Sequence, residues 1–151
     1  MATKIATNKK AYHNYFFTQT WECGIALKGS EVKSVRAGDV SFKDSFARLE
    51  GDEVFLHNLH INPYNEASYM NEEPDRIRKL LLHKHEIAKI RTFVEQKSMA
   101  LIPTKIYITE RGLVKIELAI GKGKRLYDKR EDMKKREIDR ALKRTLRTKR
   151  S

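Results

Sequence analysis

Strict alternation of apolar and polar residues predicts a β-hairpin over residues 100–121. Every second residue from Val114 to Ile120 is aliphatic, and Lys115, Glu117 and Ala119 lie between them. A period of two is typical of a strand with one buried face and one face in solvent. The preceding run "ALIPTKIYI" supplies the partner strand, and "ERG" supplies the turn.

Two further segments show strand patterns. The stretch from Val40 to Leu59 contains short β runs, in which "EGDE" (50–53) is the turn of a hairpin and "VFLHNLHI" is the return strand. The aromatic and β-branched run "YFFTQTWECGIALKG" (15–29) predicts a strand followed by a short turn.

The segment "GSEVKSVRAG" (29–38) predicts a short helix between two glycines. Ser30 is placed to cap it, and Val32 and Val35 lie three apart on one face. Lys33 and Arg36 share a second, solvent-facing side, which is either an ordinary solvated face or a binding surface.

A longer amphipathic helix is indicated by Ile87, Ile90 and Val94, whereas residues 80–82 fit either a helix or a strand. Before it, "NPYNEASYMNEEPD" reads as a long irregular loop, and loops of this length are often functional. The predicted fold is mainly β with helices, a small antiparallel β-barrel of the oligonucleotide-binding (OB) type. We expect a mobile basic arm at 1–12, the barrel at 13–121 and a basic C-terminal tail at 122–151.

The charge of the chain is concentrated in that tail. The net charge is +12, and residues 121–151 carry 14 Lys or Arg against 5 Asp or Glu, which leaves +3 for the remainder. The tail lacks aromatic residues after Tyr127, so an anionic membrane is a poorer partner than nucleic acid. Its apolar stripe is thin, so we expect disorder in the free tail and a helix once phosphates neutralise its charge.

Candidate chemistry is sparse. His83 and His85 would point apart on a helix, and His57 and His60 would face opposite sides of a strand, so neither pair predicts a metal site. Acidic residues cluster at 50–53 and 72–75, where they fit solvated turns better than a nuclease metal site. The single cysteine and the lack of a signal-peptide pattern favour a cytoplasmic protein. We expect no catalytic residues, no metal and no cofactor.

The order and spacing of several segments resemble the SmpB (SsrA-binding protein) family. These segments are "NKKAYHNYF", "GIALKGSEVKSVRAG", "SFKDSF", "RIRKLLLHKHEI" and "GKGKRLYDKRE". The resemblance implies an OB-type barrel that binds the tRNA-like domain of transfer-messenger RNA and brings it to stalled ribosomes in trans-translation. It also implies a tail that occupies the empty mRNA channel and contacts small-subunit rRNA at the decoding centre. Elongation factor Tu would act indirectly through the RNA, and the protein would be a monomer with no membrane partner.

The resemblance also implies specific site residues. Those matching the family's RNA-contacting segments are Asn8, Lys9, Lys10, Glu22, Glu31, Lys33, Arg36, Lys79, Leu81 and Lys84. Those matching its ribosome-binding tail motif are Lys122, Lys124, Arg125, Tyr127, Asp128, Lys129 and Arg130. Most of the first group are cations or amides suited to phosphate and sugar contacts, whereas a glutamate would accept bonds from base amino groups or 2′-hydroxyls, or orient neighbouring cations. Whether Tyr127 stacks on a base stays open.

The chain departs from the family pattern at Trp21, Cys23 and Ser98. The first two keep the packing character, whereas Ser98 replaces a glycine at a turn that would favour positive φ. Without the family, two other classes stay open: a small metal-dependent nuclease using scattered carboxylates, and a ribosomal or nucleoid structural protein with the same kind of basic tail.

Overall fold

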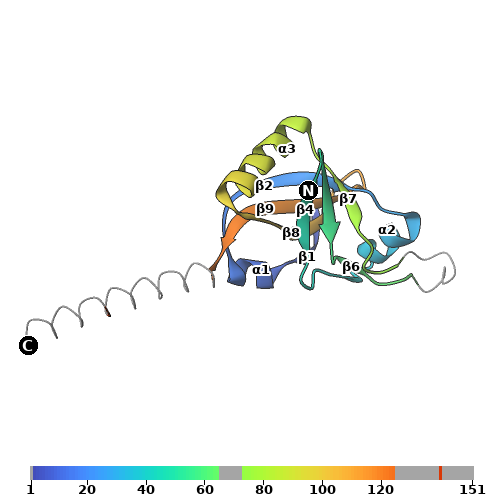
Figure 1. Ribbon diagram of the computed structural model, residues 1–151. Coiled ribbons are helices and arrows are strands. Elements are labelled where there is room, and N and C mark those ends of the chain that lie inside the picture. Colours follow the sequence, from blue (N-terminus) through green and yellow to red (C-terminus); the bar gives the residue numbers. More distant parts are fainter. Residues whose placement is uncertain (1, 65–72, 125–139, 141–151) are drawn as a thin grey trace, which may run out of the picture.

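The computed structural model describes residues 2–64, 73–124 and 140 and confirms a mainly β fold with a few helices (Figure 1). The strands are β1 (Thr3–Thr7), β2 (Tyr15–Ile25), β3 (Val40–Ser41), β4 (Phe46–Glu50), β5 (Glu53–His57), β6 (His60–Ile61), β7 (Arg78–Leu81), β8 (Ala100–Ile108) and β9 (Val114–Gly123). The helices are α1 (Lys9–Asn14), α2 (Gly29–Arg36) and α3 (Lys84–Arg91), the last continued by a π-helical turn at Thr92–Gln96.

The strands close into an antiparallel barrel, as the sequence pattern predicts. The order of the main sheet is β1-β8-β4-β5-β7-β2-β9, and β9 pairs back onto β8. Both predicted hairpins are present: β4 pairs with β5 from Phe46↔His57 to Glu50↔Glu53, and β8 pairs with β9 from Ala100↔Gly121 to Ile108↔Val114. The return strand of the first hairpin is shorter than predicted, because Asn58 has a φ of +62° and His60–Ile61 pairs with β3 instead. Among the described residues, β3 and β6 form a separate two-stranded sheet.

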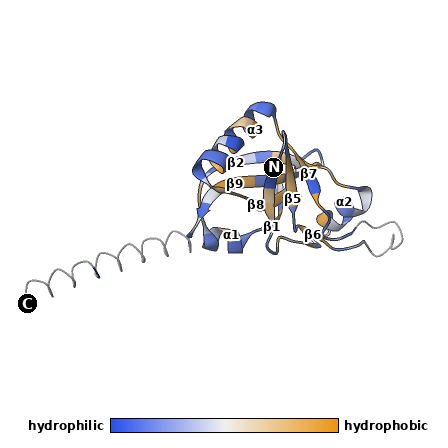
Figure 2. Cartoon of the chain, viewed as in Figure 1, coloured by the Kyte–Doolittle hydropathy of each residue, from blue (hydrophilic) through white to orange (hydrophobic). Residues whose placement is uncertain are grey.

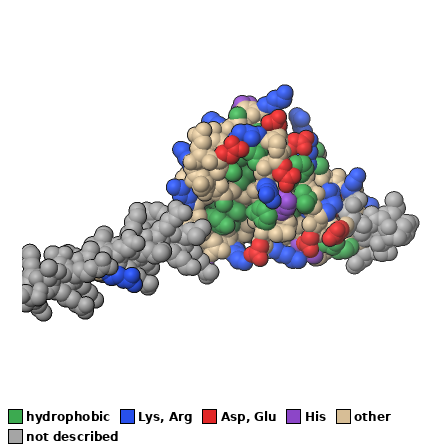
Figure 3. All heavy atoms as spheres, in the orientation of Figure 1, with side chains coloured by type: hydrophobic (Ala, Val, Ile, Leu, Met, Phe, Trp, Pro, Cys, Tyr) green, Lys and Arg blue, Asp and Glu red, His purple; other side chains and the backbone are tan. Residues whose placement is uncertain are grey.

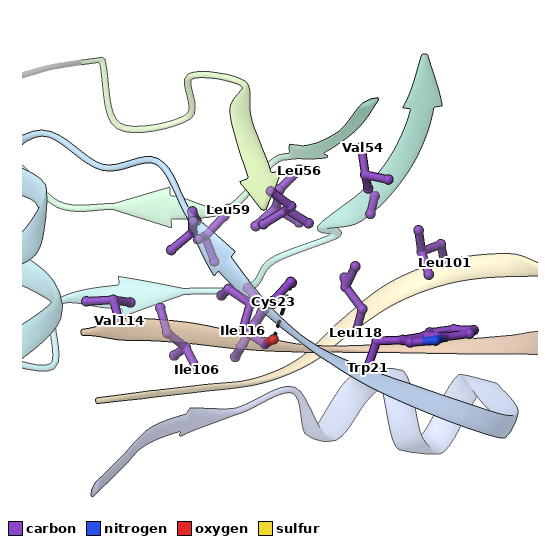
Figure 4. Close-up of a cluster of buried hydrophobic side chains, with 14 of the residues drawn as sticks. Trp21, Cys23, Val54, Leu56, Leu59, Leu101, Ile106, Val114, Ile116 and Leu118 are labelled. Atoms are coloured by element: carbon purple, nitrogen blue, oxygen red, sulfur yellow. Dashed lines mark hydrogen bonds between the residues drawn. The ribbon is translucent and has the colours of Figure 1, made fainter. Parts of the chain in front are cut away.

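Aliphatic side chains from all around the barrel form its core (Figure 4). Ile116, Leu118 and Ile120 of β9 are fully buried, and the Cys23 thiol donates to the Ile116 carbonyl oxygen at 3.3 Å. Figure 2 shows the hydrophobic residues concentrated on the strands, whereas α1 and much of α3 are hydrophilic. Burial raises the pKa of Cys23 to about 12, so the thiol stays protonated and takes part in packing.

The expected solvent face of β9 is not fully exposed. Ala119 lies on that face but is fully buried, and its register partner on β8 is Ile102. Helix α1 packs against β8 and covers this part of the barrel. The alternation therefore predicts the strand correctly but does not reveal the helix above it.

The N-terminal segment is not a mobile arm, so that part of the prediction is wrong. Residues 3–7 form β1, which pairs with β8 from Thr3↔Ile108 to Thr7↔Lys105, and α1 follows at once. This pairing joins segments about 100 residues apart in the chain, so no local pattern signals it. The division into barrel and tail stays a prediction.

The predicted short helix exists as α2, but Ser30 does not cap it. Lys28 is the N-cap residue, and its backbone N–H donates to the Glu31 carboxylate at 2.9 Å. Gly38 follows the helix at φ +80°, as expected of a stop. Ser98, where the family pattern has glycine, has a φ of +51°. The turn before β8 therefore does require the left-handed region.

The structure shows which element the leucines at 80–82 belong to, and it corrects the expected orientation of the His83 and His85 rings. Leu80 and Leu81 lie in β7, and the helix begins only at Lys84. His83 is the extended N-cap residue of α3, so its ring stacks on that of His85, with the centroids 5.6 Å apart, and does not point away. The predicted folding of the tail on binding concerns residues beyond Lys124, and it falls on residues that the structure does not describe.

Candidate nucleic-acid interface

Strand β2 separates two places where site residues gather. At its C-terminal end, Gly24 and Ile25 pair with β7, and α2 follows; we call the end of β2, β7, α2 and the β8–β9 turn the α2 end. At its N-terminal end, Tyr15 pairs with Gly123 of β9, and α1 precedes; we call α1, the start of β2 and the end of β9 the tail end. The two lie at opposite ends of this eleven-residue strand (Figure 1).

A buried ion-pair cluster organises the α2 end. Glu31 is 4% exposed and Arg78 is fully buried. Arg78 Nε donates to Glu31 Oε2 at 2.7 Å, and Arg76 Nε donates to the same oxygen at 3.2 Å. The other carboxylate oxygen, Oε1, accepts from Arg76 Nη2 and from the Lys28 backbone N–H. Both oxygens of Glu31 are therefore occupied within the protein.

Arg78 ties this carboxylate to the surrounding loops. Its Nη1 donates to the Leu59 carbonyl at 2.6 Å, and its Nη2 donates to the Pro74 carbonyl at 3.0 Å. Burial alone would raise the pKa of Glu31, but the hydrogen bonds from Arg76, the Lys28 N–H and Arg78 outweigh it and hold the pKa below its ordinary value. The ionised pair fixes the start of α2 relative to β7.

Helix α2 presents its cations from this fixed base. Lys33 and Arg36 are exposed, whereas Ser34 and Val35 face the interior. Arg36 Nη2 reaches the Gly112 carbonyl oxygen in the β8–β9 turn at 3.5 Å, and Lys33 Nζ lies 5.5 Å from the centroid of the Tyr64 ring. The two cations are thus spread between the β8–β9 turn and the loop that follows β6.

A shallow groove of about 270 Å³ lies beside the Gly112 turn that Arg36 reaches. Two leucines that stand out from its rim, Leu81 and Leu113, are 52% and 55% exposed. Its lining residues are Gly24, Ile25, Leu27, Val32, Leu81, Gly112, Leu113, Val114 and Lys115. Exposed aliphatic side chains beside Lys and Arg offer apolar contact to a base or ribose together with charge for phosphates.

Three more predicted residues lie near this end. Lys79 on β7 is exposed and forms an ion pair with Glu53 at 2.8 Å. Lys84 is exposed at the start of α3. Glu22 is exposed on β2 and accepts a hydrogen bond from the Tyr107 hydroxyl; burial, followed by that bond, raises the pKa of Tyr107.

Asn8, Lys9 and Lys10 lie at the tail end instead. Asn8 is buried, its side-chain amide donates to the Pro103 carbonyl at 2.8 Å, and its Oδ1 accepts from the Ala11 N–H at 3.1 Å. It caps α1 and attaches the helix to β8. Lys10 forms an ion pair with Asp44 at 2.6 Å, and Lys9 is exposed.

The predicted tail motif begins at the same end. Lys122 is exposed and Lys124 is half-buried. The remaining residues of the motif, Arg125, Tyr127, Asp128, Lys129 and Arg130, lie outside the described residues. The structure therefore places Asn8, Lys9 and Lys10 beside the base of the tail, and the α2 end is a separate surface.

The sequence pattern misses three residues of the α2 end. Arg76 and Arg78 hold Glu31 from 45 and 47 residues away, and Leu113 enters through the turn of the last hairpin. Two arginines flanking one isoleucine at the start of a strand are visible in the sequence, but nothing in their spacing points to Glu31.

Another face carries a wider groove. In Figure 3, hydrophobic side chains gather in the middle of the visible face, with acidic and basic groups around them. Strands β4 and β8 share the single pair Ala47↔Leu101, and a groove of about 510 Å³ lies between α1, β4 and β8.

The acidic residues of the predicted hairpin turn are engaged in ion pairs. Asp52 pairs with Arg91 and Glu53 pairs with Lys79. Within residues 2–64 and 73–124, no group of three or more His, Cys, Asp or Glu side chains is arranged to hold a metal ion. No helix in the described part of the chain is long and apolar enough to cross a bilayer.

Comparisons with known proteins show to which family the chain belongs. A family model described as SmpB protein matches residues 5–148. An SsrA-binding protein of Caldicellulosiruptor bescii is 60% identical over 135 residues, which cover 89% of this chain and 85% of the relative. An SsrA-binding protein of Caldanaerobacter subterraneus subsp. tengcongensis is 56% identical over 138 residues, or 91% of this chain and 87% of the relative. A solved structure described as "tmRNA-SmpB: a journey to the center of the bacterial ribosome" matches with a TM-score of 0.67 and 51% identity over 82% of this chain and 84% of that one. The chain is therefore a member of the SmpB family.

Proposed function

We propose that this protein is an RNA-binding adaptor that binds the tRNA-like domain of transfer-messenger RNA with its α2 end and brings that RNA to stalled ribosomes. Its relatives are named SsrA-binding proteins, and its structural neighbour is a complex of tmRNA and SmpB studied on the bacterial ribosome. The observation that carries the proposal is the α2 end itself, where a helix fixed by a buried ion pair exposes Lys33 and Arg36 and contributes Val32 to a largely apolar groove.

Within this proposal, some site residues contact the RNA and others hold the contacting residues in position. Lys33, Arg36, Lys79 and Lys84 contact phosphates and ribose, and Leu81 gives apolar contact. Glu31 orients Arg76 and α2 from beneath the surface, because both of its oxygens already accept hydrogen bonds. Glu22 remains exposed and provides an acceptor for a 2′-hydroxyl or a base amino group.

The tail has a separate role in the proposal. Lys122 and Lys124 lie at its base, and beyond Lys124 it enters the empty mRNA channel and binds rRNA at the decoding centre, where its positive charge makes binding steeply salt-dependent. Elongation factor Tu acts only through the RNA, and the adaptor carries out no chemistry. Residues Lys9 and Lys10 lie beside the base of the tail, so we assign them to the same end of the complex.

Charge reversal at Arg36 tests the assignment of the α2 end. Arg36→Glu should lower the affinity for a tRNA-like RNA by about tenfold or more and reduce the salt dependence of binding. Lys97→Glu is the control, since Lys97 follows α3 and lies outside the proposed interface. Gel-shift titration measures both variants, and equal affinities would contradict the assignment. RNA cut during incubation with Mg²⁺ would favour a nuclease instead.

A further inference from the structure

The side chain of Lys124 is attached to the body of the protein. Lys124 is the last residue that the structure describes before residues 125–139. Its Nζ donates to the Tyr12 carbonyl oxygen at 3.2 Å. The same ammonium group lies over the Phe16 ring, 4.8 Å from its centroid. Lys122, two residues earlier, is exposed, whereas Lys124 is half-buried. A cation that served only to attract a polyanion would gain nothing from these contacts.

The groups that receive Lys124 are themselves held in place. Asn8 caps α1 and is anchored to β8 by its amide and by its backbone N–H, which donates to the Thr104 carbonyl at 2.7 Å. The Tyr12 ring meets Phe17 edge-on, with the centroids 5.6 Å apart. The carbonyl of Tyr12 therefore belongs to a short helix that is fixed to the barrel at both ends.

The strand that leads to Lys124 is equally constrained. The β2–β9 pairing continues to Tyr15↔Gly123, the last residue of β9. At Gly121 the two strands approach so closely that a Cβ atom there would overlap the Phe16 carbonyl oxygen. The chain thus reaches Lys124 from a fixed position and is then held again by its side chain.

We propose that Lys124 is a positioning residue, whose ammonium group locks the base of the tail onto Tyr12 and Phe16 and so fixes where and in which direction the tail leaves the barrel. This inference rests on the proposed function of the tail. Because the α2 end and the tail end lie at opposite ends of β2, the lock sets the geometry between the bound tRNA-like RNA and the channel that the tail enters.

The lock can be measured on the free, full-length protein by NMR. The Lys124 εCH₂ protons should be shifted upfield by the Phe16 ring. The shift should disappear in Phe16→Leu and persist in Phe16→Tyr, which keeps a ring. Lysine signals at ordinary positions in the wild-type protein would overturn the lock. No RNA or ribosome enters this measurement, so its outcome is separate from that of the proposed function.

The positioning role is tested by peptide tagging on stalled ribosomes. Lys124→Met keeps the apolar stem of the side chain and removes its charge, and it should lower tagging by roughly tenfold, while the affinity for tRNA-like RNA stays within about twofold. Lys124→Arg should restore tagging, since guanidinium also donates and lies over aromatic rings.

Lys97→Met is the matched control, because Lys97 lies over the Phe93 ring at 5.0 Å in another part of the molecule. It should tag as the wild type does. Tagging by Lys124→Met at the level of Lys97→Met would overturn the positioning role. Absence of tagging by the wild-type chain would instead count against the proposed function, with the NMR result still deciding the lock.

Discussion

At the scale of single residues, the Glu31–Arg78 pair is the feature on which the proposed interface depends most. Both side chains are out of water, and their charges are compensated by each other, by Arg76 and by backbone groups. Removing one member of such a pair leaves a buried charge without its partner, which is more costly than losing the attraction alone.

Glu31→Gln should therefore lower the free energy of unfolding by about 3 kcal/mol, as measured by urea denaturation. The matched control is Glu53→Gln, which removes the carboxylate of the exposed Glu53–Lys79 pair and should cost less than about 1 kcal/mol. Equal losses in the two variants would show that the Glu31 cluster is no more important than a surface ion pair.

The pH dependence of stability gives a second test of the same residue. Glu31 has a lower pKa in the folded protein than its ordinary value of 4.5, so the folded state binds the proton less readily than the unfolded state does. Its stabilisation is complete above that value and is lost as the pH falls through the folded pKa. The stability difference between wild type and Glu31→Gln should thus narrow in acid; a constant difference from pH 7 to the acid limit of folding would contradict it.

The sequence could identify Glu31 through a family pattern and offered the orientation of cations as one of its roles, but it could not predict which cations Glu31 holds. A glutamate in the first turn of a helix ordinarily caps that helix, and Glu31 does accept the Lys28 N–H. Its arginine partners come from a different part of the chain, and only the closure of the barrel brings them near.

At the scale of elements, local pattern predicts the hairpins and α2 and fails for the N-terminal segment. Alternation and turn residues lie within a few positions of one another in β4–β5 and β8–β9, so the information is local. Strand β1 is short and polar and is defined only by its pairing with β8. The same long-range contact places α1 where it receives the base of the tail.

Two glycines give a matched prediction at this scale. Gly121→Ala should lower stability by about 2 kcal/mol or more, because the added Cβ would overlap the Phe16 carbonyl where β2 and β9 approach. Gly29→Ala, in the first turn of α2, meets no atom within 4 Å and should be neutral or stabilising. Urea denaturation measures both, and a Gly121→Ala protein as stable as Gly29→Ala would contradict the close strand approach.

At the scale of the whole molecule, the proposed function assigns polyanion binding to two separate surfaces. The α2 end is built from folded elements and an internal ion pair, whereas most of the net positive charge lies after residue 121. The sequence could predict that the tail is a separate cationic segment, because this follows from counting charged residues along the chain. The sequence could not predict that Asn8, Lys9 and Lys10 gather at the base of the tail, because that depends on how the barrel closes.

The most direct test of this separation compares the full chain with one that ends at Lys124. The account predicts that the shortened protein binds isolated tRNA-like RNA within tenfold of the full chain, a difference below about 1.4 kcal/mol, and supports no peptide tagging on stalled ribosomes. A loss of RNA affinity greater than tenfold would contradict it, because the tail would then be part of the primary RNA-binding surface.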